Sequence, residues 1–522
     1  MLLHQLIDSV AASDPERTAV HFEDEVISFA DLSARSVDAA IAVAGVTGPG
    51  DRVAIIGENH PSWLECYYGV PRAGRILVFL NHRLAPAELA SILHRSGASL
   101  LIGPQSELDR LRPLAVEFPE VRSTLDLDQW ASLLHAARDG QPDPPAASDA
   151  PGPAGEDAPA WLIYTSGTTG SPKGAMLTHG NFGAAIAASE HGRPVSADDV
   201  FLYPFPLCHV AGYNVLRLHA AGRPVVVMDR FEAGGFVDGV HRHHVTSVTM
   251  TATMVSSLLD HLDDHPEDRG RLSSLRQVAY GAAPMPPSLL RRAIDALGVD
   301  FAQGYGMTEL SGNATFLDPD AHRRALAGAE HLLAAAGRPA PNAEVRVVDD
   351  ALADVPVGES GEIVVRGAQV MAGYWMDEEA TQRAFSDGWF HTGDVGTFDR
   401  EGWLYIVDRK KDVIVTGAEN VSSREVEDAI LAACPELKEA AVVGVPDPHW
   451  GENVCAVIVL RPGSAIEPAE LTDRVRRRLA GFKVPRHVVA VDELPRNATG
   501  KVLKQQLRVW LAEHPDEVGP RR

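Results

Sequence analysis

Short apolar segments alternate with helical patterns through most of this chain, and this alternation constrains the fold more than any other feature. The segments RVAIIGEN, SLLIGP, PAWLIYTS and PVVVMDR, at 52–59, 99–104, 159–166 and 224–230, predict buried strands. Strand–helix alternation is typical of α/β folds with largely parallel sheets. We therefore expect a large domain of mostly parallel sheets flanked by helices.

The pattern changes after about residue 338. The segments EVRVVDD, GEIVVRG and WLYIVDR predict strands joined by short turns, as in a small β-rich region. From residue 409 the chain shows a strand, a helix (SSREVEDAILAA), two strands and a second helix (PAELTDRVRRRLA), the pattern of a small α+β domain. The Pro-, Ala- and acid-rich segment 139–160 is expected to be a linker.

Charge limits the partners of the chain. Its 522 residues include 47 Lys and Arg against 71 Asp and Glu, for a formal net charge of −24. A chain this acidic lacks the basic surface that nucleic acids require, so we expect no nucleic-acid partner. Only seven basic residues are lysine, and each marks a position that favours a compact charge on a flexible stem. They are Lys173, Lys410, Lys411, Lys438, Lys483, Lys501 and Lys504.

The cysteines and the N-terminal segment predict the compartment. The four cysteines are far apart and form no CxxC motif, which argues against a disulfide framework or a zinc site. The segment MLLHQLIDSVAASDPERTAV predicts an amphipathic helix, because it lacks the basic start and the apolar run of a signal peptide. No stretch resembles a membrane span. We expect a cytoplasmic protein with no transmembrane segment.

A string rich in glycine and hydroxyl groups, YTSGTTGSPKG at 164–174, directly follows the apolar strand WLIY. Its glycines allow backbone amides to turn inward around an anion, and its hydroxyls and Lys173 add donors. The string does not match GxxxxGK[ST], so it is not the motif of nucleotide-binding loops of that class. Phosphate is the natural ligand, and a flexible loop with no ligand is the alternative.

This string resembles the signature loop of the adenylate-forming superfamily, which includes acyl-CoA synthetases, adenylation domains of peptide synthesis and luciferases. Four further elements follow in the family's order: QGYGMTE at 303–309, TGD at 392–394, DRKKD at 408–412 and PRNATGK at 495–501. The resemblance covers essentially the whole chain and is closest to acyl-CoA synthetases, the fatty-acid–CoA ligases. It implies an N-terminal domain, 1–407, that binds ATP and the acid and includes a small β-barrel region. A small mobile C-terminal domain, 408–522, completes the expected architecture.

The resemblance implies ATP-dependent activation of a carboxylic acid to an acyl-adenylate, with release of pyrophosphate. The loop donors suit the β- and γ-phosphates, Glu309 supplies an oxygen for Mg²⁺, and Asp394 suits the ribose hydroxyls. The catalytic set is expected to be Lys501, Glu309, Thr165 and His209, with Lys501 bridging the carboxylate and the α-phosphate. The expected ATP-binding residues are Thr165, Ser166, Gly167, Thr168, Thr169, Gly170, Lys173, Gly281, Ala282, Ala283, Gln303, Gly304, Tyr305, Gly306, Met307, Thr308, Asp394, Ile406, Arg409 and Lys501.

The same resemblance makes Asp408 the hinge of a domain rotation between adenylation and thioester formation. Gly417, Ala418 and Glu419, with Trp450, are expected to line the tunnel for the acceptor CoA. The family usually has Gly-Gly where this chain has Gly417-Ala418, so the acceptor stays open. An acyl carrier protein or an amine is the alternative to CoA. The resemblance fits a monomer or a homodimer.

The acyl pocket is expected to use His209, Met250, Gly281, Gly304 and Gly306. The segment PFPLCHVAG at 204–212 contains no carboxylate, and an unpaired ammonium in an apolar pocket is unfavourable, so α-amino acids are disfavoured as substrates. A buried structural histidine is the alternative for His209. The choice between alkyl and aryl acids stays open. A non-enzymatic nucleotide sensor is disfavoured because Lys501, Glu309 and Asp394 are present.

Overall fold

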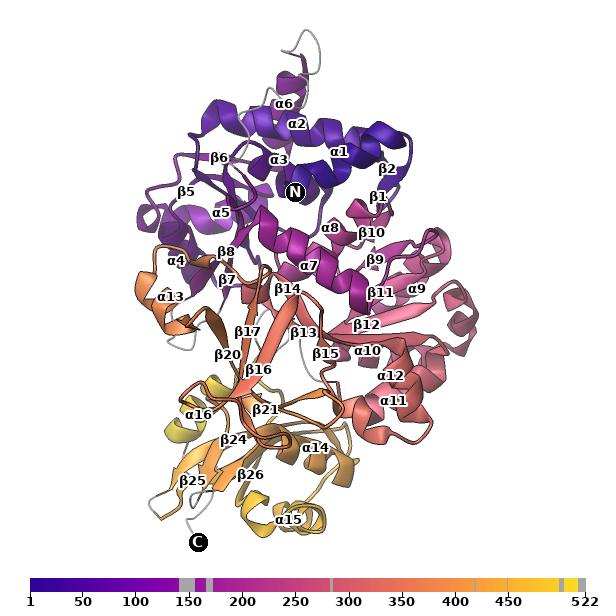
Figure 1. Cartoon of the computed structure of the whole chain (residues 1–522), viewed down its shortest axis with the longest axis vertical. Helices are drawn as coiled ribbons and strands as arrows, with labels where there is room; N and C mark the ends of the chain where they lie inside the picture. The colour runs from indigo at the N-terminus through magenta and orange to yellow at the C-terminus, as the bar shows by residue number, and fades with distance from the viewer. Residues whose placement is uncertain are drawn as a thin grey trace. The chain divides into compact units, whose positions relative to one another are not determined.

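The computed structural model describes residues 1–139, 155–165, 172–281, 285–416, 419–447, 449–496 and 502–514. The chain divides into two compact units (Figure 1). The first unit comprises 1–285, 289–345 and 365–390, and the second comprises 286–288, 346–364 and 391–522. The predicted boundary at 407/408 stays a prediction, since this division places strand β21 (Leu404–Arg409) in the second unit.

A nine-stranded sheet in the first unit carries much of the predicted site. Its central strands pair in parallel, and its last strands pair antiparallel. Its order is β15 (Arg338–Pro339), β14 (Gly312–Leu317), β13 (Asp300–Met307), β12 (Gln277–Gly281), β11 (Ser247–Met250), β9 (Phe201–Tyr203), β10 (Val225–Val227), β1 (Thr18–Phe22) and β2 (Glu25–Ser28). The end of β13 therefore lies beside the end of β12.

A second, seven-stranded sheet in the same unit holds the ends of the phosphate-loop segment. Its order is β18 (Gly373–Tyr374), β8 (Lys173–Thr178), β7 (Pro159–Thr165), β4 (Ile76–Leu80), β3 (Arg52–Ile56), β5 (Ala98–Ile102) and β6 (Ser123–Leu125). Strands β3 to β7 pair in parallel, whereas β7 and β8 form an antiparallel pair in which Thr165 lies opposite Lys173.

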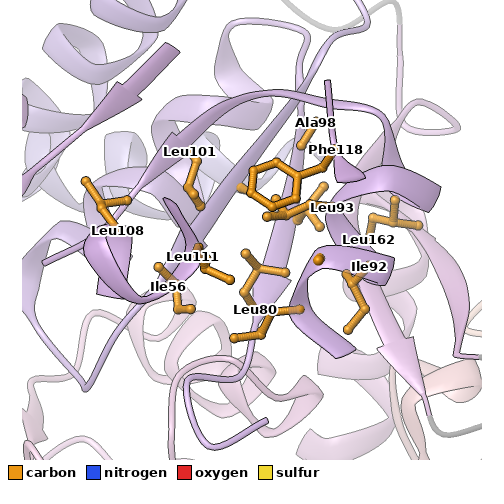
Figure 2. Packing of buried hydrophobic residues seen from close by; sticks show 14 of the residues in the cluster. Ile56, Leu80, Ile92, Leu93, Ala98, Leu101, Leu108, Leu111, Phe118 and Leu162 are labelled. Atoms are coloured by element: carbon orange, nitrogen blue, oxygen red, sulfur yellow. The ribbon is translucent and has the colours of Figure 1, made fainter. Parts of the chain in front are cut away.

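The core under this second sheet fixes the end of β7. Figure 2 shows Ile56, Leu80, Leu101 and Leu162 of its strands packed with residues from the neighbouring helices. Tyr164, one residue before Thr165, packs against the same cluster. Burial of each large aliphatic side chain contributes roughly 1.5–3 kcal/mol, so this packing holds the end of β7 in place.

Helices flank these sheets, as the alternation predicts (Figure 1). Helix α3 is buried along its whole length. In the first unit the helices are α1 (Leu3–Ser13), α2 (Phe29–Val46), α3 (Pro61–Arg72), α4 (Pro86–Ser96), α5 (Gln105–Leu111), α6 (Leu127–Asp139), α7 (His179–Gly192), α8 (Tyr213–Ala220), α9 (Ala233–His243), α10 (Ala252–Asp264), α12 (Pro319–Leu326) and α13 (Glu378–Ala384). Helix α11 (Pro287–Leu297) begins at the division between the units.

Strand β20 (Trp389–Phe398) also runs through the division. Its first residues pair with β19 (Phe385–Ser386), and its later residues pair with β21. Strands β16 (Ala343–Val348) and β17 (Gly361–Gly367) are two of the strands predicted for the β-rich region.

The second unit has a small sheet that is buried on both faces. Its strands are β22 (Ile414–Thr416), β23 (Glu419–Val421), β24 (Leu437–Asp447), β25 (Gly451–Leu460) and β26 (His487–Ala490), and its helices are α14 (Ser423–Ala433), α15 (Pro468–Arg476) and α16 (Lys504–Glu513). Val454, Ala456 and Ile458 face one core, whereas Cys455 and Val457 face the other. This alternation explains why the sequence of β25 reads as a continuous apolar run.

The predicted α/β class and the large and small parts of the chain are confirmed. All of the strands named from the sequence form, and Ser422 accepts a hydrogen bond from the Glu425 amide at the start of α14. Most of the predicted linker, residues 140–154, lies outside the described residues. Within the part of the chain that the structure describes, no helix has the length and apolar character needed to cross a membrane.

Candidate active site

The phosphate-loop segment and the QGYGMTE element meet in the first unit. Thr165 ends β7, and Glu309 lies in the 3₁₀ turn Thr308–Leu310 that follows β13. The Thr165 hydroxyl donates a hydrogen bond of 3.1 Å to Glu309 Oε1, across 144 residues of sequence. Lys173 begins β8, opposite Thr165. Ser166, Gly167, Thr168, Thr169 and Gly170 lie outside the described residues.

Sequence reasoning missed one residue at this point. The Tyr374 hydroxyl also donates to Glu309 Oε1, at 3.1 Å, and Lys173 Nζ lies 5.2 Å from the centre of the Tyr374 ring. Burial raises the pKa of Tyr374, and the Glu309 carboxylate raises it further, so the hydroxyl keeps its proton. The pair Gly373-Tyr374 is a two-residue strand with no periodicity of its own, so the sequence offered no signal for it.

The residues at Glu309 fit a magnesium ion. Its oxygen Oε1 accepts both hydrogen bonds, which leaves Oε2 as a hard ligand. No group of three or more His, Cys, Asp or Glu side chains gathers as a metal cage in the described ranges. A Mg²⁺ ion commonly uses one or two carboxylates and completes its shell with water and substrate phosphates. Glu309 would hold the ion, which would neutralise phosphate charge.

Three glycines predicted at the nucleotide and the acyl group, Gly281, Gly304 and Gly306, lie where a side chain would collide with a neighbouring residue. A Cβ at Gly304 would lie 2.3 Å from the Asn313 side chain, and one at Gly306 would lie 1.9 Å from the Gly312 carbonyl oxygen. A Cβ at Gly281 would lie 2.6 Å from the Gly304 carbonyl oxygen. Close backbone approach therefore requires glycine at 281 and 306, whereas the neighbour of Gly304 is a side chain. The contacts of these three glycines with substrate stay a prediction, and Ala282 and Ala283 lie outside the described residues.

The other predicted residues of this unit lie nearby in the sheets. Gln303, Tyr305, Met307 and Thr308 are partly buried along β13 and its following turn, whereas Met250 is fully buried in β11. The Asn81 amide nitrogen lies 3.4 Å from His209 Nε2. Burial, together with the positive charge of Arg83, lowers the pKa of His209 to about 4. His209 is therefore neutral at pH 7 and offers a hydrogen bond rather than a positive charge.

In the second unit, Asp394 and Arg409 form a pair. They lie opposite each other on β20 and β21, and Arg409 Nε lies 2.7 Å from Asp394 Oδ1. Asp394 is buried, so the ion pair compensates for its desolvation. Ile406 lies on the same strand pair, opposite Gly396. The three residues predicted at the nucleotide from this segment are thus brought together.

Asp408 joins β21 to the first helix of the small sheet region. Its Oδ2 accepts hydrogen bonds of 2.6 Å from both the amide and the hydroxyl of Ser423, at the start of α14. Its Oδ1 accepts a bond from the Arg409 amide. The predicted hinge residue is therefore anchored to α14, while its role in a rotation stays a prediction.

The predicted acceptor residues that are described lie at one edge of the small sheet. Thr416 of β22 pairs with Glu419 of β23 and with Gly451, the neighbour of Trp450. Trp450 is 38% exposed, and the Arg486 guanidinium carbon lies 4.6 Å from the centre of its ring. Gly417, Ala418 and Lys501 lie outside the described residues.

Comparisons with known proteins agree with this arrangement. The sequence model of the AMP-binding enzyme family matches residues 7–375, and that of the AMP-binding enzyme C-terminal domain matches residues 425–501. A feruloyl-CoA synthase from Amycolatopsis sp. is 39% identical over 95% of this chain and 96% of its own length. An indoleacetate–CoA ligase from Aromatoleum aromaticum is 35% identical over 98% of both chains.

A solved structure gives the same result. The o-succinylbenzoate CoA synthetase from Bacillus subtilis, in complex with its acyl-adenylate intermediate, has a TM-score of 0.83 at 32% identity, over 97% of this chain and 98% of its own. The same enzyme has been solved with ATP and magnesium ion, also with a TM-score of 0.83.

Proposed function

This chain belongs to the AMP-binding enzyme family, and on that premise we propose that it activates an aryl carboxylic acid and transfers the acyl group to CoA. The observation that carries the proposal is the hydrogen bond between Thr165 and Glu309. It unites the end of the phosphate-loop strand with the carboxylate suited to magnesium, which is the arrangement needed to hold a metal-bound triphosphate.

The reaction has two steps, and the same acyl group passes through both. In the first, a carboxylate oxygen of the acid attacks the α-phosphorus of ATP, the bond to the β-phosphate oxygen breaks, and pyrophosphate leaves. In the second, the CoA thiolate attacks the acyl carbonyl carbon and AMP leaves. Lys173 and the loop donors would hold the departing phosphates, and Lys501 would neutralise charge as it builds at the α-phosphate.

An aryl acid is favoured by three relatives and by the neutral state of His209. Feruloyl, indoleacetyl and succinylbenzoyl groups, named for the three similar proteins, all carry an aromatic ring. Neutral His209 supports an uncharged pocket wall near the carboxylate.

CoA is favoured as the acceptor by the edge that carries Glu419 and Trp450. The Trp450 ring is 38% exposed and the Arg486 guanidinium lies over it, and such a pair suits a purine ring and its phosphates. An acyl carrier protein would present the same pantetheine thiol without the adenine group. An amine acceptor would carry neither the pantetheine arm nor the adenine group. The acceptor can therefore be identified directly from the product.

The test is pyrophosphate release with ATP, Mg²⁺ and a panel of acids: cinnamates, arylacetates, benzoates and unbranched alkanoates. We expect the aryl acids to be turned over best, and mass spectrometry to show their CoA thioesters. Lys501→Ala should abolish pyrophosphate release, whereas Lys438→Ala, at an exposed lysine outside every motif, should not. Release of pyrophosphate with a carrier-protein or amide product, and no CoA thioester, would refute the acceptor. Failure of every acid to release pyrophosphate would refute the activation step.

A further inference from the structure

Tyr374 is held on both sides by backbone hydrogen bonds. The Met371 amide donates to the Glu309 carbonyl at 2.8 Å, which fixes the segment to the turn that carries Glu309. The amides of Ala372 and Trp375 donate to Met176 and Gly174 of β8, at 3.0 and 2.7 Å. Tyr374 is thus tied to the Glu309 turn and to the strand that begins at Lys173.

The hydroxyl of Tyr374 fixes the orientation of the Glu309 carboxylate. Two donors, Thr165 Oγ1 and Tyr374 Oη, converge on Oε1, each at 3.1 Å. With one oxygen held by two hydrogen bonds from different strands, the carboxylate plane is defined and Oε2 is presented in a single direction. Hydrogen bonds of this kind to a ligating carboxylate typically affect metal affinity by roughly 10–100-fold.

The ring of Tyr374 has a second effect, on Lys173. The ammonium lies 5.2 Å from the ring centre, within the range of a cation–π interaction. Among the described residues, Lys173 makes no ion pair with Glu309 or any other carboxylate. The ring thus gives the ammonium a partner other than Glu309, whereas a direct ion pair with Glu309 would neutralise both groups.

We propose that Tyr374 is a positioning residue for the metal-bound nucleotide: its hydroxyl orients Glu309 toward the metal, and its ring keeps the Lys173 ammonium free for phosphate. This inference rests on the proposed function only for the identity of the nucleotide. The two effects belong to different parts of one side chain, so two substitutions separate them.

Tyr374→Phe keeps the ring and removes the hydroxyl, whereas Tyr374→Leu removes both. For the phenylalanine variant we expect the Mg²⁺ concentration for half-maximal pyrophosphate release to rise 10–100-fold, with most of kcat recovered at saturating Mg²⁺. Equilibrium binding measures the same effect without turnover: Mn²⁺ affinity in the presence of ATP, read by electron paramagnetic resonance, should fall by a similar factor. ATP affinity in EDTA should be unchanged in Tyr374→Phe and reduced several-fold in Tyr374→Leu.

Two further variants complete the design. Thr165→Val removes the other donor to Oε1, and its effect on Mn²⁺ affinity should not add to that of Tyr374→Phe, because both act on one oxygen. Tyr68→Phe removes a buried tyrosine hydroxyl that bonds His219 at 2.7 Å, far from these motifs, and should leave Mn²⁺ affinity unchanged.

Unchanged Mn²⁺ affinity in Tyr374→Phe would overturn the role of the hydroxyl, and unchanged ATP affinity in Tyr374→Leu would overturn the role of the ring. Binding of Mn²⁺ and ATP is measured without any acid. A wild-type protein that binds both but activates no acid would refute the proposed function and would leave this test intact.

Discussion

At the scale of single residues, four of the lysines that the structure describes fall into two kinds. Lys410, Lys483 and Lys504 form ion pairs: Lys410 with Asp350 and Glu362, Lys483 with Glu425, and Lys504 with Glu427. Lys173 instead lies over an aromatic ring at the end of a loop rich in anion-binding groups. The first kind stabilises the fold, and the second is available for a ligand.

This difference predicts which lysine tolerates arginine. Lys173→Arg should lower the rate of pyrophosphate release at least about 10-fold, because a planar fork cannot replace a compact ammonium between the Tyr374 ring and the phosphates. Lys483→Arg should leave the rate unchanged, since its pair with Glu425 is near the surface and arginine can form it too. Steady-state kinetics at saturating Mg²⁺ measure both. Equal rates for the two variants would contradict the assignment of Lys173.

Buried neutral histidines predict a loss of stability in acid. His219 is fully buried, bonded to the Tyr68 hydroxyl and the Ala19 carbonyl, and burial lowers its pKa from 6.5 to about 4. The unfolded chain binds a proton here below pH 6.5 and the folded chain only near pH 4, so the free energy of unfolding falls as the pH drops through this window. The full effect is about 3 kcal/mol.

Urea unfolding between pH 7 and pH 4.5 tests this prediction. His219→Gln should show a shallower dependence of the unfolding free energy on pH than the wild type, even if its stability at pH 7 is lower. Replacement of the exposed His331 by Gln is the matched control. A slope for His219→Gln equal to that of the wild type would show that this histidine does not titrate between the two states.

At the scale of elements, the hairpin of β13 and β14 shows why glycines recur in QGYGMTE. The register shifts between Tyr305 and Gly306, and a Cβ added at Gly306 would lie 1.9 Å from the Gly312 carbonyl oxygen and 2.6 Å from the Asn313 Cα. Both of these neighbouring atoms belong to the backbone, so no change of a side-chain rotamer could make room for a Cβ at position 306. The same strand continues into the turn that presents Glu309, so its geometry sets the position of the carboxylate.

We therefore expect Gly306→Ala to destabilise the protein by at least about 2 kcal/mol and to abolish pyrophosphate release. Gly183→Ala is the matched control, because Gly183 lies inside helix α7 with nothing within 4 Å of its missing Cβ. That variant should gain about 0.5–1 kcal/mol from reduced backbone entropy and keep its activity. Thermal unfolding and activity together measure both. A stable, active Gly306→Ala protein would contradict the strand-packing explanation.

The sequence predicts elements better than it predicts contacts. Apolar runs such as those of β3, β7 and β25 predict strands because burial depends on local composition. The loop string and QGYGMTE predict Thr165 and Glu309 as site residues, but their hydrogen bond follows from the way two sheets pack. Tyr374 was missed for the same reason: its partners lie 65 and 201 residues away, and its own strand has two residues.

At the scale of the whole molecule, the residues proposed to hold the phosphates and the metal lie in a different unit from those proposed for the acceptor, although Asp394 and Arg409, proposed at the nucleotide, also lie in the second unit. Thr165, Glu309, Lys173 and Tyr374 belong to the first unit. Glu419, Trp450 and Arg486 belong to the second. A substitution confined to one group should therefore separate the half-reactions.

Trp450→Ala should keep pyrophosphate release but lower CoA thioester formation at least about 10-fold, because it removes an exposed ring suited to stack on the nucleotide part of CoA. Glu309→Gln should fail to form the adenylate from acid and ATP, yet should still convert a supplied acyl-adenylate to the thioester. Trp510→Phe, which alters another tryptophan of the second unit, in helix α16, should leave both steps unchanged. Single-turnover assays that start from the acid or from the adenylate measure the two steps apart. If Trp450→Ala lost both steps equally, Trp450 would serve the fold or adenylation rather than the acceptor, and its assignment to the second half-reaction would be wrong.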